Sequence, residues 1–464
     1  MKKYLTLLAG SLLLFSCRDY LDVVPKGYVI PTSVKEYELL LIGGDNGPHR
    51  TKNETVLHLT NDNFFLTSQE VGDTNNTGNI NFALYSWSNY RFSDSSVPNP
   101  AWNDGYKNIY TYNKIINEID EATFEVGDTE EKRRRVKAQA YYGRAYEYLF
   151  LVNTFAKQYN QSTAGSDPGV PLVLQADVTQ TLPSRGTVEG VYNQILSDLG
   201  EAVKYLPEES QIQLLPTLGA GYALMARTYL YQSDYANAKK YAEMALEEKS
   251  DLVDYTQPDF SNYSLSLKYA EQYTQHYMAL PGSGFLNDEM VSLFEESGFD
   301  DKRLSEQFIP REVTEDGQVV GVRYTMGSYD YNYRGSTSVS VPEMYITLAE
   351  AEARLGNLGT AVTLLNTLRN NRVDGNVELT LGDFAGQTDL VKFCLEERRR
   401  EMVYTNTRLF DLKRENLESA YAKTTVHKVV GNNPLEITAE PNSGKLILPI
   451  PAQVLKFNPS MPQN

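Results

Sequence analysis

Residues 223–245 read ALMARTYLYQSDYANAKKYAEMA and predict two antiparallel helices joined by a tight turn. The turn falls at Ser233-Asp234, between two stretches with helical spacing. Small or apolar side chains recur on one face of each helix: Ala223, Ala226 and Leu230 on the first, and Ala238, Tyr241 and Ala245 on the second. Small residues at a crossing let two helices approach closely, which is how tetratricopeptide-type pairs pack.

A second stretch, residues 346–368, repeats this arrangement. Its turn falls at Gly356-Asn357, and its two faces are formed by Ile346, Ala349 and Ala353, then by Ala361, Leu364 and Leu368. Roughly ninety residues, 249–338, separate the two pairs. We therefore predict a mainly α fold: a tetratricopeptide-like helix-pair scaffold with a large loop-rich insertion that contains short strands.

Further helices are expected on the amino-terminal side of these pairs. Apolar spacing predicts helices over 106–122, 130–154 and 188–205, while two prolines and a glycine make 168–181 a non-helical connection. Two regions, about 66–101 and 249–338, are rich in polar and turn residues, and 321–326 alternates like a strand. Ligand-binding surfaces usually lie on such loop-rich regions.

The amino terminus predicts export. Lys2 and Lys3 precede an apolar run that ends at Ser16, directly before Cys17. This is the pattern of a secretory signal over 1–16, and the run is too short to span a bilayer. Leu14-Phe15-Ser16-Cys17 resembles a bacterial lipobox, in which acyl chains such as palmitate anchor the cysteine. The alternatives are an ordinary signal peptide or a buried amino-terminal segment with a cysteine nearby by chance.

Composition limits the partners. The net charge of −17 argues against nucleic acid, because a nucleic-acid binder needs a basic surface. The chain has 33 tyrosines and 2 tryptophans, which favours tyrosine as the aromatic residue of any binding surface. With Cys17 acylated, Cys394 has no disulfide partner, and its helical context predicts a small buried hydrophobe.

No catalytic or metal motif stands out. The four histidines, at 49, 58, 276 and 427, lack zinc-helix spacing, and neither a Gly-x-Ser-x-Gly elbow nor a phosphate-binding glycine loop occurs. Spacing alone cannot nominate a carboxylate pair for glycoside hydrolysis. We expect no cofactor, no bound metal and no enzyme activity. The basic runs 132–135 and 398–400 are flanked by glutamates, which predicts salt-bridged, solvated helix faces.

Two aromatic sets are candidate sugar contacts, because flat rings pack on the apolar faces of sugars. Tyr329, Tyr331 and Tyr333 alternate with polar residues, which would place the three rings on one face of a strand. The alternative is that this face packs on the scaffold. The second set is Tyr85, Trp87 and Tyr90, for which packing of Trp87 in the core is the alternative.

Residues 73–79 resemble the first half of a calcium loop, but Leu84 stands where the bidentate glutamate is required. We therefore interpret the segment as a turn-rich loop. The amide side chains of Asn75 and Asn76 are candidate contacts to ligand hydroxyls.

Several motifs, taken in order, resemble the SusD/RagB family of outer-membrane nutrient-binding lipoproteins from Bacteroidetes. The matching segments are CRDYLD at 17–22 with Pro25, WNDGYKNI at 102–109 with Asn113, the Ala- and Tyr-rich helix 135–149, EERRRE at 396–401 with RLFDLKR at 408–414, and LPIP at 448–451 with the ending at 458–464. Together they cover the chain from end to end.

The resemblance implies that 17–464 form one nutrient-binding domain, lipid-anchored at the outer membrane and exposed on the cell surface. It also implies a partner, a SusC-like TonB-dependent outer-membrane barrel that the protein caps. Family members bind glycans in many cases and peptides in some. The scarcity of tryptophan departs from the best-known starch binder, which leaves the ligand open. The residues also leave open two functions of a different class, a surface glycoside hydrolase and a scaffold that binds only protein.

Overall fold

The computed structural model describes residues 30–43, 47–48, 55–71, 80–88, 99–257, 270–274, 277–278, 284–295, 299–315, 318–326, 335–336, 338–403, 405, 407–431 and 434–464. The predictions for Cys17, Asn75, Asn76, Tyr90, Tyr329, Tyr331 and Tyr333 concern residues outside these ranges.

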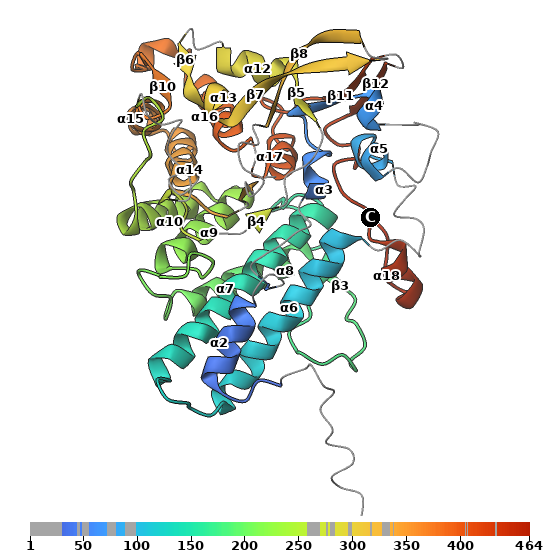
Figure 1. Ribbon diagram of the computed structural model, residues 1–464, viewed down its shortest axis with the longest axis vertical. Coiled ribbons are helices and arrows are strands. Elements are labelled where there is room, and N and C mark those ends of the chain that lie inside the picture. The colour runs from blue at the N-terminus through green and yellow to red at the C-terminus, as the bar shows by residue number, and fades with distance from the viewer. Residues whose placement is uncertain are drawn as a thin grey trace, which may run out of the picture.

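Helices dominate the described chain, as the sequence predicted (Figure 1). They are α2 (Val34–Ile42), α3 (Thr55–His58), α4 (Ser68–Val71), α5 (Ile80–Tyr85), α6 (Pro100–Glu118), η2 (Ile119–Glu121), α7 (Glu130–Phe155), α8 (Val188–Ala202), α9 (Leu218–Tyr231), α10 (Tyr235–Glu248), α12 (Asp288–Glu295), α13 (Lys302–Gln307), α14 (Val341–Arg354), α15 (Leu358–Arg369), η4 (Leu381–Asp383), α16 (Gln387–Glu401), α17 (Arg408–Glu415) and α18 (Ala452–Phe457).

The strands are short. They are β1 (Phe64–Thr67), β2 (Pro168–Pro171), β3 (Arg185–Thr187), β4 (Tyr277–Met278), β5 (Phe285–Leu286), β6 (Asp300–Asp301), β7 (Phe308–Glu315), β8 (Gln318–Met326), β9 (Gly335–Ser336), β10 (Val373–Asp374), β11 (Thr425–Val430) and β12 (Leu435–Ala439).

The scaffold is a run of helices in which neighbours pack against one another: α6 on α7, α7 on α8, α9 on α10, α10 on α14, and α14 on α15. Both predicted helix pairs, α9–α10 and α14–α15, are confirmed. Their turns use left-handed backbone, with φ of 59° at Ser233 and 88° at Gly356. Because α10 packs on α14, the two pairs stack although the insertion separates them in sequence.

The first long helix starts a turn and a half before its predicted start at Tyr106. Asn99 is its N-cap, with the side-chain oxygen accepting a hydrogen bond from the Trp102 amide, and Pro100 occupies the first helical turn. Proline suits that position because its missing N–H would have no helical partner there. Trp102 is buried against Phe155 and Tyr106, so it packs helices together.

The main core lies between the helices and contains many tyrosines. Tyr142, Tyr148, Tyr192 and Tyr231 are each at most 1% exposed. These tyrosines serve the core, so the high tyrosine content does not by itself indicate a binding surface. Cys394 is also fully buried, as predicted.

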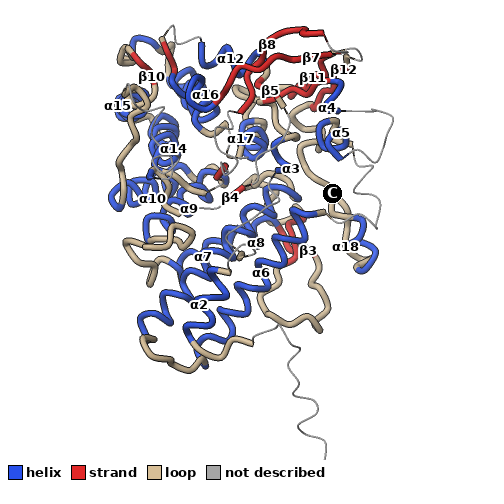
Figure 2. Tube along the Cα trace, viewed as in Figure 1, coloured by secondary structure: helices blue, strands red, loops and turns tan. Residues whose placement is uncertain are grey.

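Most of the strands gather at one end of the molecule (Figure 2). A four-stranded sheet has the order β12-β11-β1-β5, in which β1 runs parallel to β11 and antiparallel to β5. The insertion supplies β5 and the β7–β8 hairpin, which confirms the strand predicted at 321–326. It also contains the helices α12 and α13, which the sequence did not predict.

Candidate ligand-binding site

The two described members of the 85–90 aromatic set lie on the core side of the four-stranded sheet. Tyr85 is 1% exposed, and its hydroxyl donates to the carbonyl oxygen of Lys428 at 2.8 Å. Its ring stacks on the His427 imidazole with centroids 4.2 Å apart. The prediction that Tyr85 contacts ligand is therefore corrected: the ring is enclosed, and the hydroxyl fastens β11.

Trp87 stacks on the same imidazole at 3.9 Å, so the two aromatic rings enclose His427 between them. Its indole nitrogen donates to the carbonyl oxygen of Thr60 at 3.1 Å, and the side chain is partly buried. The position of Trp87 therefore agrees with packing in the core. Burial lowers the pKa of His427 to about 4, although its ring nitrogens lie 2.6 and 2.8 Å from backbone carbonyl oxygens.

The opposite side of the sheet lines a cleft of about 300 Å³, which we call the sheet cleft. The side chains of β11 alternate between the two faces of the sheet: His427 and Val429 are buried on the core side, while Lys428 and Val430 are exposed on the side of the cleft. The cleft lies between β1, β11, β12, β8 and the start of α12, with an apolar floor and polar groups around it. It is lined by Phe64, Phe65, Val426, Val430, Asn287, Asp288, Glu289, Arg323, Lys428 and Glu436.

The polar side chains at the start of α12 are held in place. The Asn287 carboxamide accepts from the Met290 amide at 2.7 Å and donates to the Asp62 carbonyl oxygen at 2.6 Å. This fixes the entry into α12 and hence the positions of Asp288 and Glu289. The loop-rich region 249–338, which the sequence predicted to carry binding surface, contains Asn287, Asp288, Glu289 and Arg323 of this cleft. None of these four residues was predicted individually as a ligand contact.

A second cleft, of about 270 Å³, adjoins α17, and we call it the α17 cleft. Glu289 lines both clefts, so the two clefts adjoin at this residue. The α17 cleft is lined by Glu289, Leu293, Lys392, Leu395, Glu396, Arg399, Arg408, Glu415, Ala420, Tyr421, Ala422 and Lys423.

The Glu289 carboxylate is 56% exposed but held by two cations, Arg399 at 2.7 Å and Lys423 at 2.9 Å. Burial alone would raise the pKa of Glu289; the charges of Arg399 and Lys423 outweigh it and lower that pKa. Lys423 also lies 2.6 Å from the buried carboxylate of Asp62. Glu289 is thus an ionised, oriented hydrogen-bond acceptor at the junction of the two clefts.

The basic run 398–400 is buried, which corrects the prediction of a solvated face. Arg398, Arg399 and Arg400 are at most 5% exposed. Arg398 pairs with Asp411 at 3.0 Å and Arg400 with Glu397 at 2.9 Å, inside the protein. The sequence pattern could not show this, because i, i+4 glutamates flank buried and exposed arginines alike. The run 132–135 does pair at the surface, as Arg134 with Glu130 at 3.2 Å.

Within the described ranges, no group of three histidine, cysteine or acidic side chains is arranged to hold a metal ion. None of the helices in that part of the chain has the length and apolar character that crossing a bilayer requires.

Comparison with known proteins identifies the family. A family model described as "Starch-binding associating with outer membrane" matches residues 19–230, and one described as "SusD family" matches residues 253–464. Together they cover most of the chain in sequence order. The chain belongs to the SusD/RagB family, as the motifs indicated.

The chain is similar to its relatives over nearly their whole length. SusD-like protein P2 of Formosa agariphila is 24% identical over all of this chain and 99% of its own length. A SusD superfamily protein from Bacteroides vulgatus matches in structure with a TM-score of 0.73 at 20% identity, covering 93% of this chain and 98% of that one. Surface glycan-binding protein A from Bacteroides uniformis matches with a TM-score of 0.69 at 19% identity, covering 93% and 99%. These structures confirm the fold.

Proposed function

We propose that this protein captures a glycan at the outer-membrane surface without cleaving it and delivers it to a TonB-dependent barrel. An acylated Cys17 would hold it at the membrane. Family membership supports the compartment and the partner, and the name of the Bacteroides uniformis neighbour, a surface glycan-binding protein, supports the ligand class.

The observation that carries this proposal is the composition of the sheet cleft. Phe64, Phe65 and the valines of β11 give an apolar floor, against which the C–H face of a sugar ring can pack. Asp288, Glu289 and Arg323 offer acceptors and donors for hydroxyl groups around it. Small-molecule sites commonly combine an apolar lining with a few polar groups in about 300–1,000 Å³.

A ligand longer than one sugar unit can use both clefts. Because Glu289 lies at their junction, its carboxylate can accept hydrogen bonds from a chain that passes from the sheet cleft to the α17 cleft. Tyr90, Asn75, Asn76, Tyr329, Tyr331 and Tyr333 remain proposed contacts. In sequence the three later tyrosines follow β8, the strand that carries Arg323.

Calorimetric titration of the purified mature chain with a panel of oligosaccharides tests the site. We expect Asp288→Ala and Arg323→Ala each to weaken binding about tenfold to a hundredfold, since each loses a hydrogen bond to a charged group worth about 1.5–3 kcal/mol. Asp120→Ala and Arg134→Ala are matched controls. Both side chains are exposed and lie on η2 and α7, neither of which contributes a residue to the sheet cleft.

The same panel separates the competing functions. New reducing ends during incubation would indicate a hydrolase, and binding confined to peptides would indicate a peptide-binding member of the family. Unchanged affinity in both cleft variants would place the glycan outside the sheet cleft. Absence of any small ligand, with stable co-purification of the barrel, would leave a protein-binding scaffold.

A further inference from the structure

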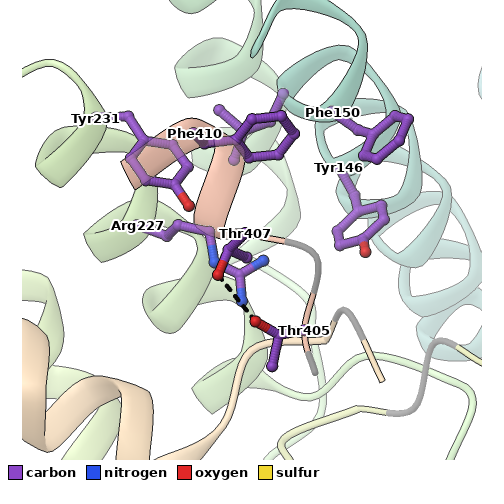
Figure 3. Close-up of a pocket in the computed structure, with 8 residues that line it drawn as sticks. Tyr146, Phe150, Arg227, Tyr231, Thr405, Thr407 and Phe410 are labelled. Atoms are coloured by element: carbon purple, nitrogen blue, oxygen red, sulfur yellow. Dashed lines mark hydrogen bonds between the residues drawn. The ribbon is translucent and has the colours of Figure 1, made fainter. Parts of the chain in front are cut away.

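A small cavity lies where α7, α9 and α17 meet (Figure 3). It offers about 20 Å³ to the centre of a water molecule. Its lining combines apolar rings with hydroxyl groups and one guanidinium: Tyr146, Leu149, Phe150, Arg227, Tyr231, Thr405, Thr407 and Phe410. This cavity is separate from both clefts, since it shares no lining residue with them.

The hydroxyl of Tyr231 has no hydrogen-bond partner among the described residues, and the side chain is 0% exposed. Figure 3 shows its oxygen pointing past the Arg227 side chain toward Thr407. An enclosed donor without a partner is unfavourable, because the group has lost its hydrogen bonds to water on folding. The geometry therefore calls for an acceptor inside the cavity.

Two threonines that also line the cavity, Thr405 and Thr407, offer a hydrogen-bond acceptor to a group bound there. Thr405 donates its only hydroxyl hydrogen to the Met402 carbonyl oxygen at 2.8 Å. The two threonine hydroxyl oxygens are also 2.8 Å apart, so the hydrogen between them must belong to Thr407. The Thr407 oxygen thus keeps a lone pair that can accept a hydrogen bond from the cavity.

We propose that the cavity binds one internal water molecule, which accepts from the Tyr231 hydroxyl and donates to the Thr407 hydroxyl. The volume fits, since a water requires roughly 10–15 Å³ of such space and two or more polar partners. The hydrogen bonds then run in one direction, from Tyr231 through the water, Thr407 and Thr405 to the Met402 carbonyl oxygen. Each of the three side-chain hydroxyl hydrogens in this series of hydrogen bonds then has an acceptor.

The water would join parts of the protein that are far apart in sequence. Tyr231 ends α9, whereas Thr407 is the N-cap of α17, and Met402 follows α16. The connection between α16 and α17 is thereby tied to the scaffold. This inference does not depend on the proposed function, because neither residue lines a ligand cleft.

A crystal structure of the full mature chain, with density for ordered water, tests the site directly. We expect a peak within hydrogen-bond distance of both the Tyr231 and the Thr407 hydroxyl oxygens. In urea unfolding, Tyr231→Phe and Thr407→Val should each lower the unfolding midpoint, because each removes one partner of the water. Tyr192→Phe is the matched control, since its buried hydroxyl donates directly to Asn153 at 3.0 Å; its midpoint should fall without any change in the cavity.

An empty cavity in that structure would overturn the proposal. So would an unfolding midpoint that rises in Tyr231→Phe, because removing an unsatisfied hydroxyl stabilises a protein, whereas removing a hydrogen-bonded one does not.

Discussion

Arg227 of α9 and Glu343 of α14 form a two-point ion pair inside the protein, with N–O distances of 2.7 and 2.5 Å. Glu343 is 0% exposed and Arg227 4%. Arg398 of α16 also reaches Glu343, at 3.2 Å. The pair connects the two helix pairs that the insertion separates, so the stacking of the scaffold includes a buried electrostatic contact as well as apolar packing.

Breaking this pair should be strongly destabilising. We expect Arg227→Met to lower the free energy of unfolding by about 3–5 kcal/mol, because it leaves a buried carboxylate short of a partner. Urea unfolding followed by circular dichroism measures the change. Lys204→Met, which breaks an exposed pair with Glu201, should cost no more than about 1 kcal/mol. Equal effects of the two substitutions would contradict a special role for the buried pair.

Acid should destabilise the fold over a defined pH range. Burial alone would raise the pKa of Glu350, but Arg414 and Arg354 outweigh it and lower that pKa from 4.5 to about 2. The unfolded chain therefore binds the proton at a higher pH than the folded chain does. The resulting stabilisation, about 3 kcal/mol, is complete above pH 4.5 and is lost as the pH falls toward 2.

Unfolding free energies measured across that range check this prediction. Glu350→Gln should be less stable at neutral pH and should show a weaker pH dependence between about pH 4.5 and 2, because one of the titrating groups is gone. A pH profile that Glu350→Gln leaves unchanged would assign acid unfolding to other carboxylates, such as Asp62, whose pKa the neighbouring cations also lower in spite of its burial.

Gly143 allows α6 and α7 to pack closely. A Cβ atom at this position would lie 2.2 Å from a ring atom of Tyr112, which is fully buried. We expect Gly143→Ala to destabilise the protein by about 1–3 kcal/mol, even though alanine favours helix. Gly200→Ala, in α8 with no atom near the added methyl, should stabilise by about 0.5–1 kcal/mol. Thermal unfolding of both variants would show opposite shifts in Tm.

Tyr85→Phe distinguishes support of the sheet from contact with ligand. The substitution removes the hydroxyl that donates to Lys428 and should cost about 1 kcal/mol of stability. Because the ring lies behind the sheet cleft, the Kd for a bound glycan should change by less than about twofold. A larger loss of affinity without a loss of stability would return Tyr85 to the ligand site.

Substitution of Cys17 tests the proposed lipid anchor, and substitution of Cys394, the other cysteine of the chain, is its matched control. Cys17→Ala should release the protein from the membrane fraction, because several acyl chains on one residue are needed for stable attachment. Cys394→Ala, at a fully buried position, should leave membrane attachment unchanged. Cell fractionation with immunodetection, and mass spectrometry of the mature amino terminus, measure the outcome. A Cys17→Ala protein that stays membrane-bound would remove the anchor from the proposal.

Local features of the fold could be predicted from the sequence. The helix expected at 130–154 is observed at Glu130–Phe155, and both helix pairs turn where small and polar residues predicted. The helix expected at 188–205 ends at Ala202, about one turn early, because helix ends depend on capping contacts more than on apolar spacing.

The long scaffold helices, their pairing through small side chains and the burial of Cys394 could be predicted from the sequence, because each follows from a pattern over neighbouring residues. The family could be predicted from short motifs in a fixed order along the chain. The helices α12 and α13 could not, since the insertion lacks a clear helical period. Three other features become visible only in the folded protein: Arg398–Arg400 are buried, Tyr85 and Trp87 enclose His427, and β1, β8, β11, β12 and α12 form one cleft. The physical reason is that a periodic pattern shows which face of an element is apolar, whereas the partner that covers this face, or neutralises its charges, comes from a distant part of the chain.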